Sequence, residues 1–374
     1  MVINNKYLKV ISSGIKQIPG WRTKRKIVII ESDDWGSIRM PSKETYEKML
    51  KAGVRVEECA YNRFDSLASE DDLTTLFEVL NKFKDSDGNP PVITANCLLA
   101  NPDFERIRNS DFREYHFEIF TETLKKYPKH HSSYELWEEG IRQKLFFPQF
   151  HGREHLNVAR WMEGLRKNLK ETRLAFDHGL FGISTTISSE KRKSYLEAFG
   201  CDNPADIESH KQIIKHGLDL FEQVFGYKSK SFIAPKYTWH HDLDTVLAER
   251  GVLYFQNKGY RIEQHPDQYK VERLYPGKRN NLNQIYLRRN CLFEPSFSTK
   301  DWLNSCLKEI SLSFMMHKPA VIQSHRVNFI GFIDPTNRDR NIKLLDALFH
   351  NILRRWPDIK FMTSVEIGDM IAET

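Results

Sequence analysis

Short apolar segments rich in β-branched residues alternate with amphipathic helical patterns, and this alternation restricts the fold more than any other feature. The apolar run at 27–30 is followed by helical patterns at 42–53 and 69–83, and the next β-branched run begins at Val92. Two strands separated by a helix lie parallel, because the crossover between them needs a dozen or more residues. The pattern therefore predicts an α/β fold built on a parallel sheet. Further strands are expected at 145–150, 229–235, 251–256, 319–325 and 359–364, and further helices at 210–226, 242–251 and 342–352.

The number of these units favours a closed barrel. About seven strand–helix units without a glycine-rich phosphate loop are more typical of a barrel than of a doubly wound open sheet. The 374 residues are expected to form one decorated barrel domain, 1–374, because such barrels commonly carry insertions. Residues 102–145 are polar and aromatic-rich, and we predict a helical insertion there. The chemistry of barrels lies where the strands end at the C-terminal face.

Composition narrows the class of protein. Hydrophobic residues at 40% and charged residues at 28% are typical of a globular protein and exclude disorder. Residues 1–26 lack the apolar core of a signal peptide and no stretch of about 18 apolar residues follows, so a cytoplasmic protein is expected. The five cysteines are scattered, which favours reduced thiols. The net charge of +6 is compatible with an anionic partner or peripheral membrane contact, but no nucleic-acid-binding motif accompanies it, and no nucleic-acid partner is expected.

Polar residues that could act in catalysis or metal binding follow four of the expected strands. Because the carboxyl ends of parallel strands meet at one face of a barrel, these residues are expected to converge. They are Asp33 and Asp34 after the first strand, His151 and His155 in "HGREH", the segment "APKYTW" at 234–239, and His325.

His151 and His155 are candidate metal ligands. Histidines four residues apart fall on one face of a helical turn, so both imidazoles can reach one zinc-type ion at about 2.0 to 2.1 Å. Two histidines and one carboxylate form a common catalytic set that leaves positions open for water and substrate. The alternatives are an aspartate pair that only caps a turn and two surface histidines that bind nothing.

His325 ends an apolar strand, beside Ser324 and Arg326. A lone histidine in such a place is often a hydrogen-bonded core residue. Its position at the same face as the other three groups instead favours a catalytic role. With an unperturbed pKa near 6.5, a histidine can donate a proton to a leaving group at neutral pH.

Taken together, the motifs resemble those of the polysaccharide deacetylase superfamily, the NodB-homology carbohydrate esterases, in the family's order from "ESDDWG" to "TSVEIGDMI". The resemblance implies a distorted TIM-like (β/α)7 barrel and a metal-dependent deacetylase. Its first motif falls on Asp33 as general base and Asp34 as metal ligand. The second falls on His151 and His155 as the other two ligands, and the last on His325 as general acid.

The third motif departs from the family pattern. The family has an arginine two residues before a proline, and this chain has Ile233 before Pro235. The backbone N–H of the next residue, Lys236, would help to hold the oxyanion. We expect a substitute cation near Asp33, supplied by Lys236, Arg153 or Arg326. The second motif also has Gly152 where the family usually has Ser or Thr.

The resemblance implies hydrolysis of an N- or O-acetyl group on a saccharide, with a divalent ion, zinc as the first choice. Trp35, Tyr237, Trp239 and Arg326 are the expected substrate-binding residues, and the oligomeric state is left open. Three alternatives stay open: a zinc metallopeptidase that uses Glu154 of "HGREH" as its base, a two-carboxylate glycoside hydrolase, and a barrel that binds saccharides without turnover.

Overall fold

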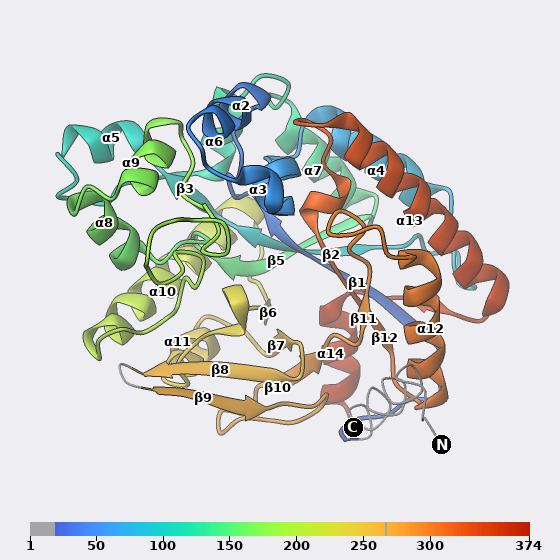
Figure 1. The fold of residues 1–374 in the computed structure, drawn as a ribbon. Helices are drawn as coiled ribbons and strands as arrows, with labels where there is room; N and C mark the ends of the chain where they lie inside the picture. Colours follow the sequence, from blue (N-terminus) through green and yellow to red (C-terminus); the bar gives the residue numbers. More distant parts are fainter. Residues whose placement is uncertain (1–18, 266–267) are drawn as a thin grey trace, which may run out of the picture.

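The computed structural model describes residues 19–265 and 268–374; the predicted absence of a signal peptide concerns residues that lie largely outside this range. A curled, mostly parallel sheet of nine strands forms the centre, and helices cover its outer side (Figure 1). The expected α/β barrel class is thereby confirmed. Along the sheet the strands follow the order β10 (Ile285–Arg288), β7 (Tyr254–Asn257), β6 (Ser231–Phe232), β5 (Phe146–Gly152), β2 (Ile93–Leu98), β1 (Ile27–Trp35), β12 (Ala320–His325) and β11 (Cys291–Leu292), with β13 (Lys360–Phe361) beside β1.

The expected helices form, and their ends follow local sequence signals. The side chain of Ser42 caps α2 (Lys43–Lys51), and Ser69 with Asp72 forms a capping box on α4 (Glu70–Asn81). Gly226, with φ of 74°, ends α10 (Ala205–Phe225) in the left-handed conformation that glycine adopts readily. The remaining α-helices are α3 (Ala60–Phe64), α5 (Phe104–Asn109), α6 (Phe120–Lys126), α7 (Ser133–Arg142), α8 (Val158–Arg166), α9 (Lys170–Asp177), α11 (Leu243–Glu249), α12 (Trp302–Met315), α13 (Pro335–Arg355) and α14 (Ser364–Ala372).

Residues 102–145 contain α5, α6 and α7 together with β4 (Phe117–Ile119), which pairs with β3 (Ala100–Pro102). Whether this segment is an insertion into the barrel stays a prediction. A second small sheet, β8 (Tyr260–His265) with β9 (Gln268–Arg273), was not predicted from the sequence. It lies along the lower edge of the view in Figure 1.

The segment from 285 to 292 joins the two ends of the curled sheet and was also not predicted. Its first half, β10, pairs with β7, and its second half, β11, pairs with β12. Between them the Arg289 N–H donates to the Asn257 carbonyl (2.8 Å) and the Asn290 N–H donates to the Val321 carbonyl (3.1 Å). Three polar residues in succession, 288–290, interrupt the apolar run, so the periodicity of the sequence does not indicate a strand here.

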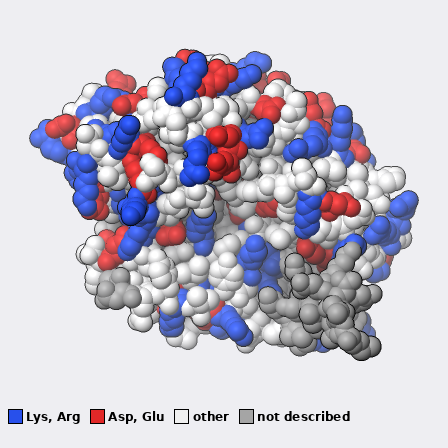
Figure 2. All heavy atoms as spheres, in the orientation of Figure 1, with Lys and Arg blue, Asp and Glu red and all other residues white. Residues whose placement is uncertain are grey.

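Among the described residues, no helix is both long and apolar enough to cross a lipid bilayer. On the face drawn in Figure 2, basic and acidic side chains lie interspersed over the described residues. The sheet interior is apolar at its N-terminal end, where Ile27 and Ile29 are completely buried. Charged side chains gather at the opposite, C-terminal end of the strands.

Candidate active site

Asp33 and Asp34 both line a cavity of about 410 Å³ at the C-terminal end of β1. Successive residues of a regular strand face opposite sides, so an irregularity is needed to bring both carboxylates to one place. The register of β1 against β2 shifts between Ser32 and Trp35, and Asp34 has a φ of 76°. This bulge allows the side chains of two adjacent aspartates to enter the same cavity.

His151 and His155 reach the same cavity and approach Asp34. The Asp34 Oδ1 atom lies 3.6 Å from His151 Nε2 and 3.4 Å from His155 Nε2. His151 belongs to β5 and His155 to the loop that follows, so the expected helical turn is wrong. The two histidines converge because the chain bends back after the strand. We call Asp34, His151 and His155 the Asp34 cluster.

The Asp34 cluster fits a zinc-type ion. In tetrahedral geometry, donor atoms at about 2.1 Å from an ion lie about 3.4 Å from one another, close to the two distances above. His151 Nδ1 donates to the Ile233 carbonyl (2.7 Å), which leaves the lone pair on Nε2. No described residue accepts a hydrogen bond from His155 Nδ1. Burial and the positive charge of Arg39 lower the pKa of His155 well below its usual value, so this imidazole is neutral, as a ligand must be.

Arg39 holds the second oxygen of Asp34. Its Nη2 atom lies 3.1 Å from Asp34 Oδ2, and its Nε atom lies 3.8 Å from Asp65. Burial alone would raise the pKa of Asp34, but Arg39 and the neighbouring histidines lower it well below the usual range. Asp34 is therefore ionised, with Oδ1 directed at the histidines. The sequence carried no signal for Arg39 beyond its place a few residues after the strand.

Arg289 supplies the cation that was expected near Asp33. Its Nη1 and Nη2 atoms donate to the two Asp33 oxygens at 2.6 Å each, and its Nε donates to Glu31 Oε2 at 2.5 Å. Asn96 Nδ2 donates to Asp33 Oδ1 at 2.7 Å. Burial opposes ionisation of Asp33, but Arg289 outweighs it and the pKa of Asp33 lies well below its usual value. The substitute charge thus comes from the strand segment that joins the ends of the sheet.

None of the three cations proposed from the sequence has that position. Lys236 is exposed at the cavity, Arg153 pairs with Glu154, and Arg326 is completely buried in a bidentate pair with Asp65. Proximity in sequence to the matched proline was therefore a poor guide. The cation is instead 256 residues from Asp33 along the chain.

His325 lies beside Asp33, because the two residues are register partners in β12 and β1. His325 Nε2 is 3.7 Å from Asp33 Oδ2, and His325 Nδ1 is 2.6 Å from Glu294 Oε1. Burial would lower the pKa of His325, but the Glu294 carboxylate raises it to about 9. The imidazolium is thus the main form at neutral pH. Glu294 follows the short strand β11 and was missed because that strand was missed.

Lys236 has a positive φ of 59° in the turn after β6. Among the described residues, none accepts a hydrogen bond from its backbone N–H. Tyr237, the next residue, lines the cavity, and its hydroxyl is 3.3 Å from Gln323 Oε1. Two further aromatic residues, Tyr61 and Phe297, form edge contacts with each other and flank His325.

Three of the four expected substrate-binding residues do not line the cavity. The Trp35 indole is buried in the core and donates to Ser32, and Trp239 is buried, stacks on Phe255 and donates to Asp244. Both tryptophans follow strands but point into the hydrophobic layer, and Arg326 is occupied by Asp65 as described above. Of the four, only Tyr237 lines the cavity.

Glu154 is the residue of "HGREH" that would be the base of a metallopeptidase. It is buried and makes a bidentate pair with Arg153, with both N–O distances 2.7 Å. It does not line the cavity that holds the Asp34 cluster. This arrangement gives Glu154 no place as a base beside the two histidines.

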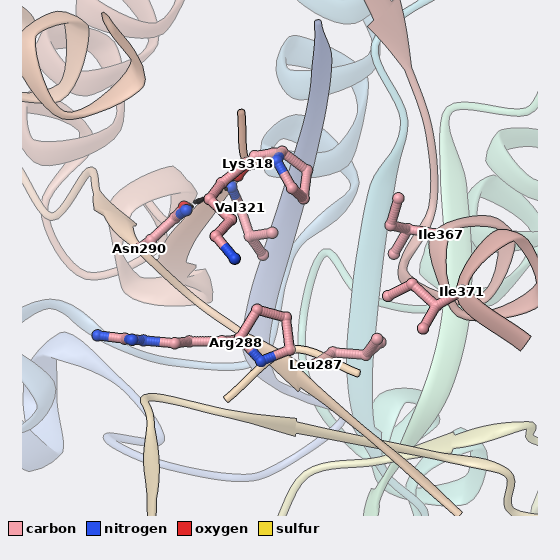
Figure 3. A pocket seen from close by; sticks show the side chains of 9 residues that line it. Leu287, Arg288, Asn290, Lys318, Val321, Ile367 and Ile371 are labelled. Atoms are coloured by element: carbon pink, nitrogen blue, oxygen red, sulfur yellow. Dashed lines mark hydrogen bonds between the residues drawn. The ribbon is translucent and has the colours of Figure 1, made fainter. Parts of the chain in front are cut away.

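A pocket at the other end of the barrel has no comparable chemistry (Figure 3). It encloses about 20 Å³ between β10, β12 and α14, and its apolar lining includes Leu287, Val321 and Ile367. It lies at the start of β12, whereas His325 ends that strand. The pocket is too small for a ligand of saccharide size.

Comparison with known proteins supports the fold. No protein-family model matches this chain, and no curated protein matches it. A candidate glycoside hydrolase/deacetylase from Parabacteroides distasonis matches with a TM-score of 0.52 and 8% identity, over 94% of this chain and 72% of that one. A candidate polysaccharide deacetylase from Mycobacterium smegmatis matches with a TM-score of 0.44 and 12% identity, over 95% and 93%.

The 4-alpha-glucanotransferase from Thermococcus litoralis matches with a TM-score of 0.44 and 12% identity, over 91% of this chain but only 40% of that protein. At such identities the likeness is one of fold alone. The first of these similarities, with a TM-score above 0.5, agrees with the α/β barrel fold described above.

Proposed function

We propose that this protein is a metal-dependent hydrolase that removes an acetyl group from an N- or O-acetylated saccharide. The observation that carries the proposal is a geometric one: Asp33 Oδ2 lies 3.7 Å from His325 Nε2, Arg289 contacts the carboxylate and Glu294 contacts the imidazole, in the cavity that contains the Asp34 cluster. A base and an acid whose pKa values are shifted in opposite directions by separate partners form the usual arrangement for acid–base hydrolysis.

The metal contribution rests on the Asp34 cluster. Asp34, His151 and His155 would hold a divalent ion, zinc as the first choice, which when bound lowers the pKa of a water ligand and polarises the acetyl carbonyl. Arg39 keeps Asp34 ionised, and the Ile233 carbonyl keeps the His151 lone pair on Nε2.

The chain's own residues supply the remaining steps. Asp33, held on both oxygens by Arg289, accepts the proton of the attacking water and is kept in orientation by Asn96. The backbone N–H of Lys236, which has no hydrogen-bond acceptor among the described residues, is a donor for the carbonyl oxygen as negative charge develops on that oxygen. His325, protonated with the help of Glu294, gives its proton to the departing sugar amine or hydroxyl. Acetate and the deacetylated sugar are the products.

The walls of the cavity suit a saccharide. Tyr61, Tyr237 and Phe297 offer ring faces and edges for the apolar side of a sugar ring. A second cavity of about 1010 Å³ shares Gln323 with the first. Among the described residues its charged lining comprises Lys258, Arg273, Arg288, Arg289 and the acid Glu309, and the charge of Arg289 is already balanced by Asp33 and Glu31. This excess of positive charge favours a substrate with an anionic group next to the acetylated sugar. We further propose a cytoplasmic location, on the sequence pattern alone.

The main rival is a barrel that binds a saccharide without turnover. One sample tests both functions: acetate release from N-acetylated chito-oligosaccharides and from an acetylated uronate oligosaccharide, measured together with bound metal. The expected result for the unmodified protein is acetate release and one ion at the Asp34 cluster. His151→Ala should lose that ion and turnover with it, since removal of a ligand should cost more than the roughly 10- to 100-fold in metal affinity that loss of an outer-shell partner costs.

The peptidase alternative is tested by Glu154→Gln, which should leave acetate release unchanged in the folded fraction. Undiminished metal at the Asp34 cluster in His151→Ala, or no acetate release from any acetylated saccharide by metal-loaded protein, would contradict the proposal. Hydrolysis of a peptide that depends on Glu154 would favour the metallopeptidase.

A further inference from the structure

A second group of metal-ligating side chains lies outside the catalytic cavity, between the loop after Tyr237 and the strand β8. His240, His241 and Glu263 each offer one donor atom, and these atoms all lie within 4.8 Å of one another. We call these residues the Glu263 cluster. The proposed deacetylation uses none of them, and none lines the catalytic cavity.

Two further potential ligands border the Glu263 cluster. The carboxylate of Asp242 spans both imidazoles, with Oδ2 at 3.4 Å from His240 Nδ1 and Oδ1 at 3.2 Å from His241 Nε2. His265 Nε2 lies 3.8 Å from Glu263 Oε2, and the His240 and His265 rings are 5.2 Å apart. Three imidazoles and two carboxylates therefore face one small region.

Contacts of the backbone hold this region in place. The Trp239 N–H donates to the Ile262 carbonyl (3.1 Å), and the His241 N–H donates to Glu263 Oε1 (2.7 Å). Glu263 is buried, with a side-chain exposure of 3%, whereas His241 is exposed at 55%. A buried carboxylate fixed by a backbone donor, with an exposed imidazole beside it, can bind an ion with little rearrangement of the chain.

We propose that His240, His241 and Glu263 form a second binding site for a divalent transition-metal ion, with Asp242 or His265 as a further ligand. Imidazole with carboxylate is a donor set that suits zinc, copper or nickel better than calcium or magnesium. His241 Nδ1 is 2.5 Å from Glu263 Oε1, a hydrogen-bond distance, so His241 binds the ion through Nε2 or after its ring turns. An ion there ties the loop that begins at Pro235, beside the catalytic cavity, to β8.

The experiment counts zinc ions per chain after dialysis against micromolar zinc. The full chain is expected to bind two ions and to gain thermal stability from the second. His241→Ala, in an exposed side chain that should not affect folding, is expected to lose one ion and to keep the ion of the Asp34 cluster. His151→Ala is expected to lose the other ion and to keep this one. His350→Ala, in an exposed histidine of α13, is the matched control and should bind as the full chain does.

The two proposals fail in different ways. If the Asp34 cluster binds no metal, the full chain binds one ion and His241→Ala binds none, and the second site still stands. If His241→Ala and Glu263→Gln both bind as many ions as the full chain, the second site is overturned whatever the state of the first. Binding that requires millimolar zinc, as a solvent-exposed histidine pair alone would show, also overturns it.

Discussion

The Asp34 cluster and the Glu263 cluster contain the same kinds of side chain but differ in what holds them. In the Asp34 cluster each candidate ligand is buried, and Arg39 and the Ile233 carbonyl, which are not ligands themselves, orient Asp34 and His151. In the Glu263 cluster the main partners are other members of the cluster. A site whose ligands are oriented by outside partners binds with less loss of side-chain entropy and is better suited to precise chemistry.

The same contrast extends to the proposed catalytic pair. Asp33 and His325 each have a dedicated partner of opposite charge, Arg289 and Glu294 respectively. The Glu263 cluster has no such pair of an acid and a base with separate charged partners among the described residues. Within that part of the chain, Lys270 is the only Lys or Arg paired with Glu263. From this difference we infer chemistry for the first region and binding for the second. Three substitutions at the proposed catalytic pair and its partners test this division, and a fourth tests the charge of the second cavity.

The largest effect is expected for Asp33→Asn, which removes the proposed proton acceptor and keeps the shape of the side chain. Turnover should fall by a factor on the order of 10² to 10⁴, the usual contribution of general acid–base catalysis. Bound metal should be unchanged, because Asp33 is not one of the three ligands. Initial rates of acetate release and metal content on the same sample check this. Glu263→Gln, which should lose only the ion of the Glu263 cluster, is the matched control for turnover, and a larger loss of turnover from this control would contradict the comparison.

Arg289→Lys should reduce turnover by about tenfold, which corresponds to about 1.4 kcal/mol in the barrier. Lysine keeps the charge but cannot grip both Asp33 oxygens as the planar guanidinium does. Lys236→Met, the substitution suggested by sequence proximity, should change turnover by less than about threefold. Steady-state kinetics of the two variants separate the two assignments. A tenfold loss of turnover in Lys236→Met, with no loss in Arg289→Lys, would show that Lys236 and not Arg289 is the cation that supports Asp33.

Glu294→Gln should move the alkaline limit of activity to lower pH. The pKa of His325 is raised to about 9 by Glu294, so the proton donor is present at pH 7 and is lost as the pH rises through about 9. Without the carboxylate the pKa falls, and activity is lost at a lower pH. The pH profile of kcat measures the shift, and rescue by Glu294→Asp separates a charge effect from misfolding. An unchanged profile would leave Glu294 a structural residue.

The smallest effect is expected for Lys258→Ala at the second cavity. Lys258 lies near Arg289 in a basic lining, and removal of one exposed charge should raise KM for an anionic saccharide by about two- to fivefold, roughly the 0.5 to 1 kcal/mol of a surface ion pair. KM for a neutral acetylated saccharide should not change. Lys84→Ala, an exposed lysine that lines neither cavity, is the control. Equal effects on both substrates would show that the cavity does not distinguish charge.

Much of the barrel could be predicted from the sequence because its signals are local. Apolar runs such as that of β1, the N-caps Ser42 and Ser69, and the stop at Gly226 depend on residues within one turn or strand. The strand-end positions of Asp33, Asp34 and His325 followed from the same pattern together with the rule that parallel strands meet at one face.

The prediction failed where a side chain's direction or partner depends on distant segments. Trp35 and Trp239 were expected at the substrate, but each points into the core, since a strand-end position does not specify which face a side chain takes. The strand segment 285–292 was not predicted because consecutive polar residues interrupt its apolar pattern. For the same reason the roles of Arg289 and Glu294 were not predicted.

The sequence by itself determined most of the order of strands and helices, though not β8 to β11, together with the class of fold and the side chains that we propose as an acid, a base and three metal ligands. Periodicity, capping residues and short motifs carry that information within a few residues of each other. Only the tertiary structure decided which charged residues contact Asp33 and His325. Arg289 reaches Asp33 across 256 residues of chain, and Glu294 reaches His325 across 31, because curling of the sheet brings the segment 285–292 between β7 and β12. A buried carboxylate needs a cation, but the requirement can be met from any strand that closes around it.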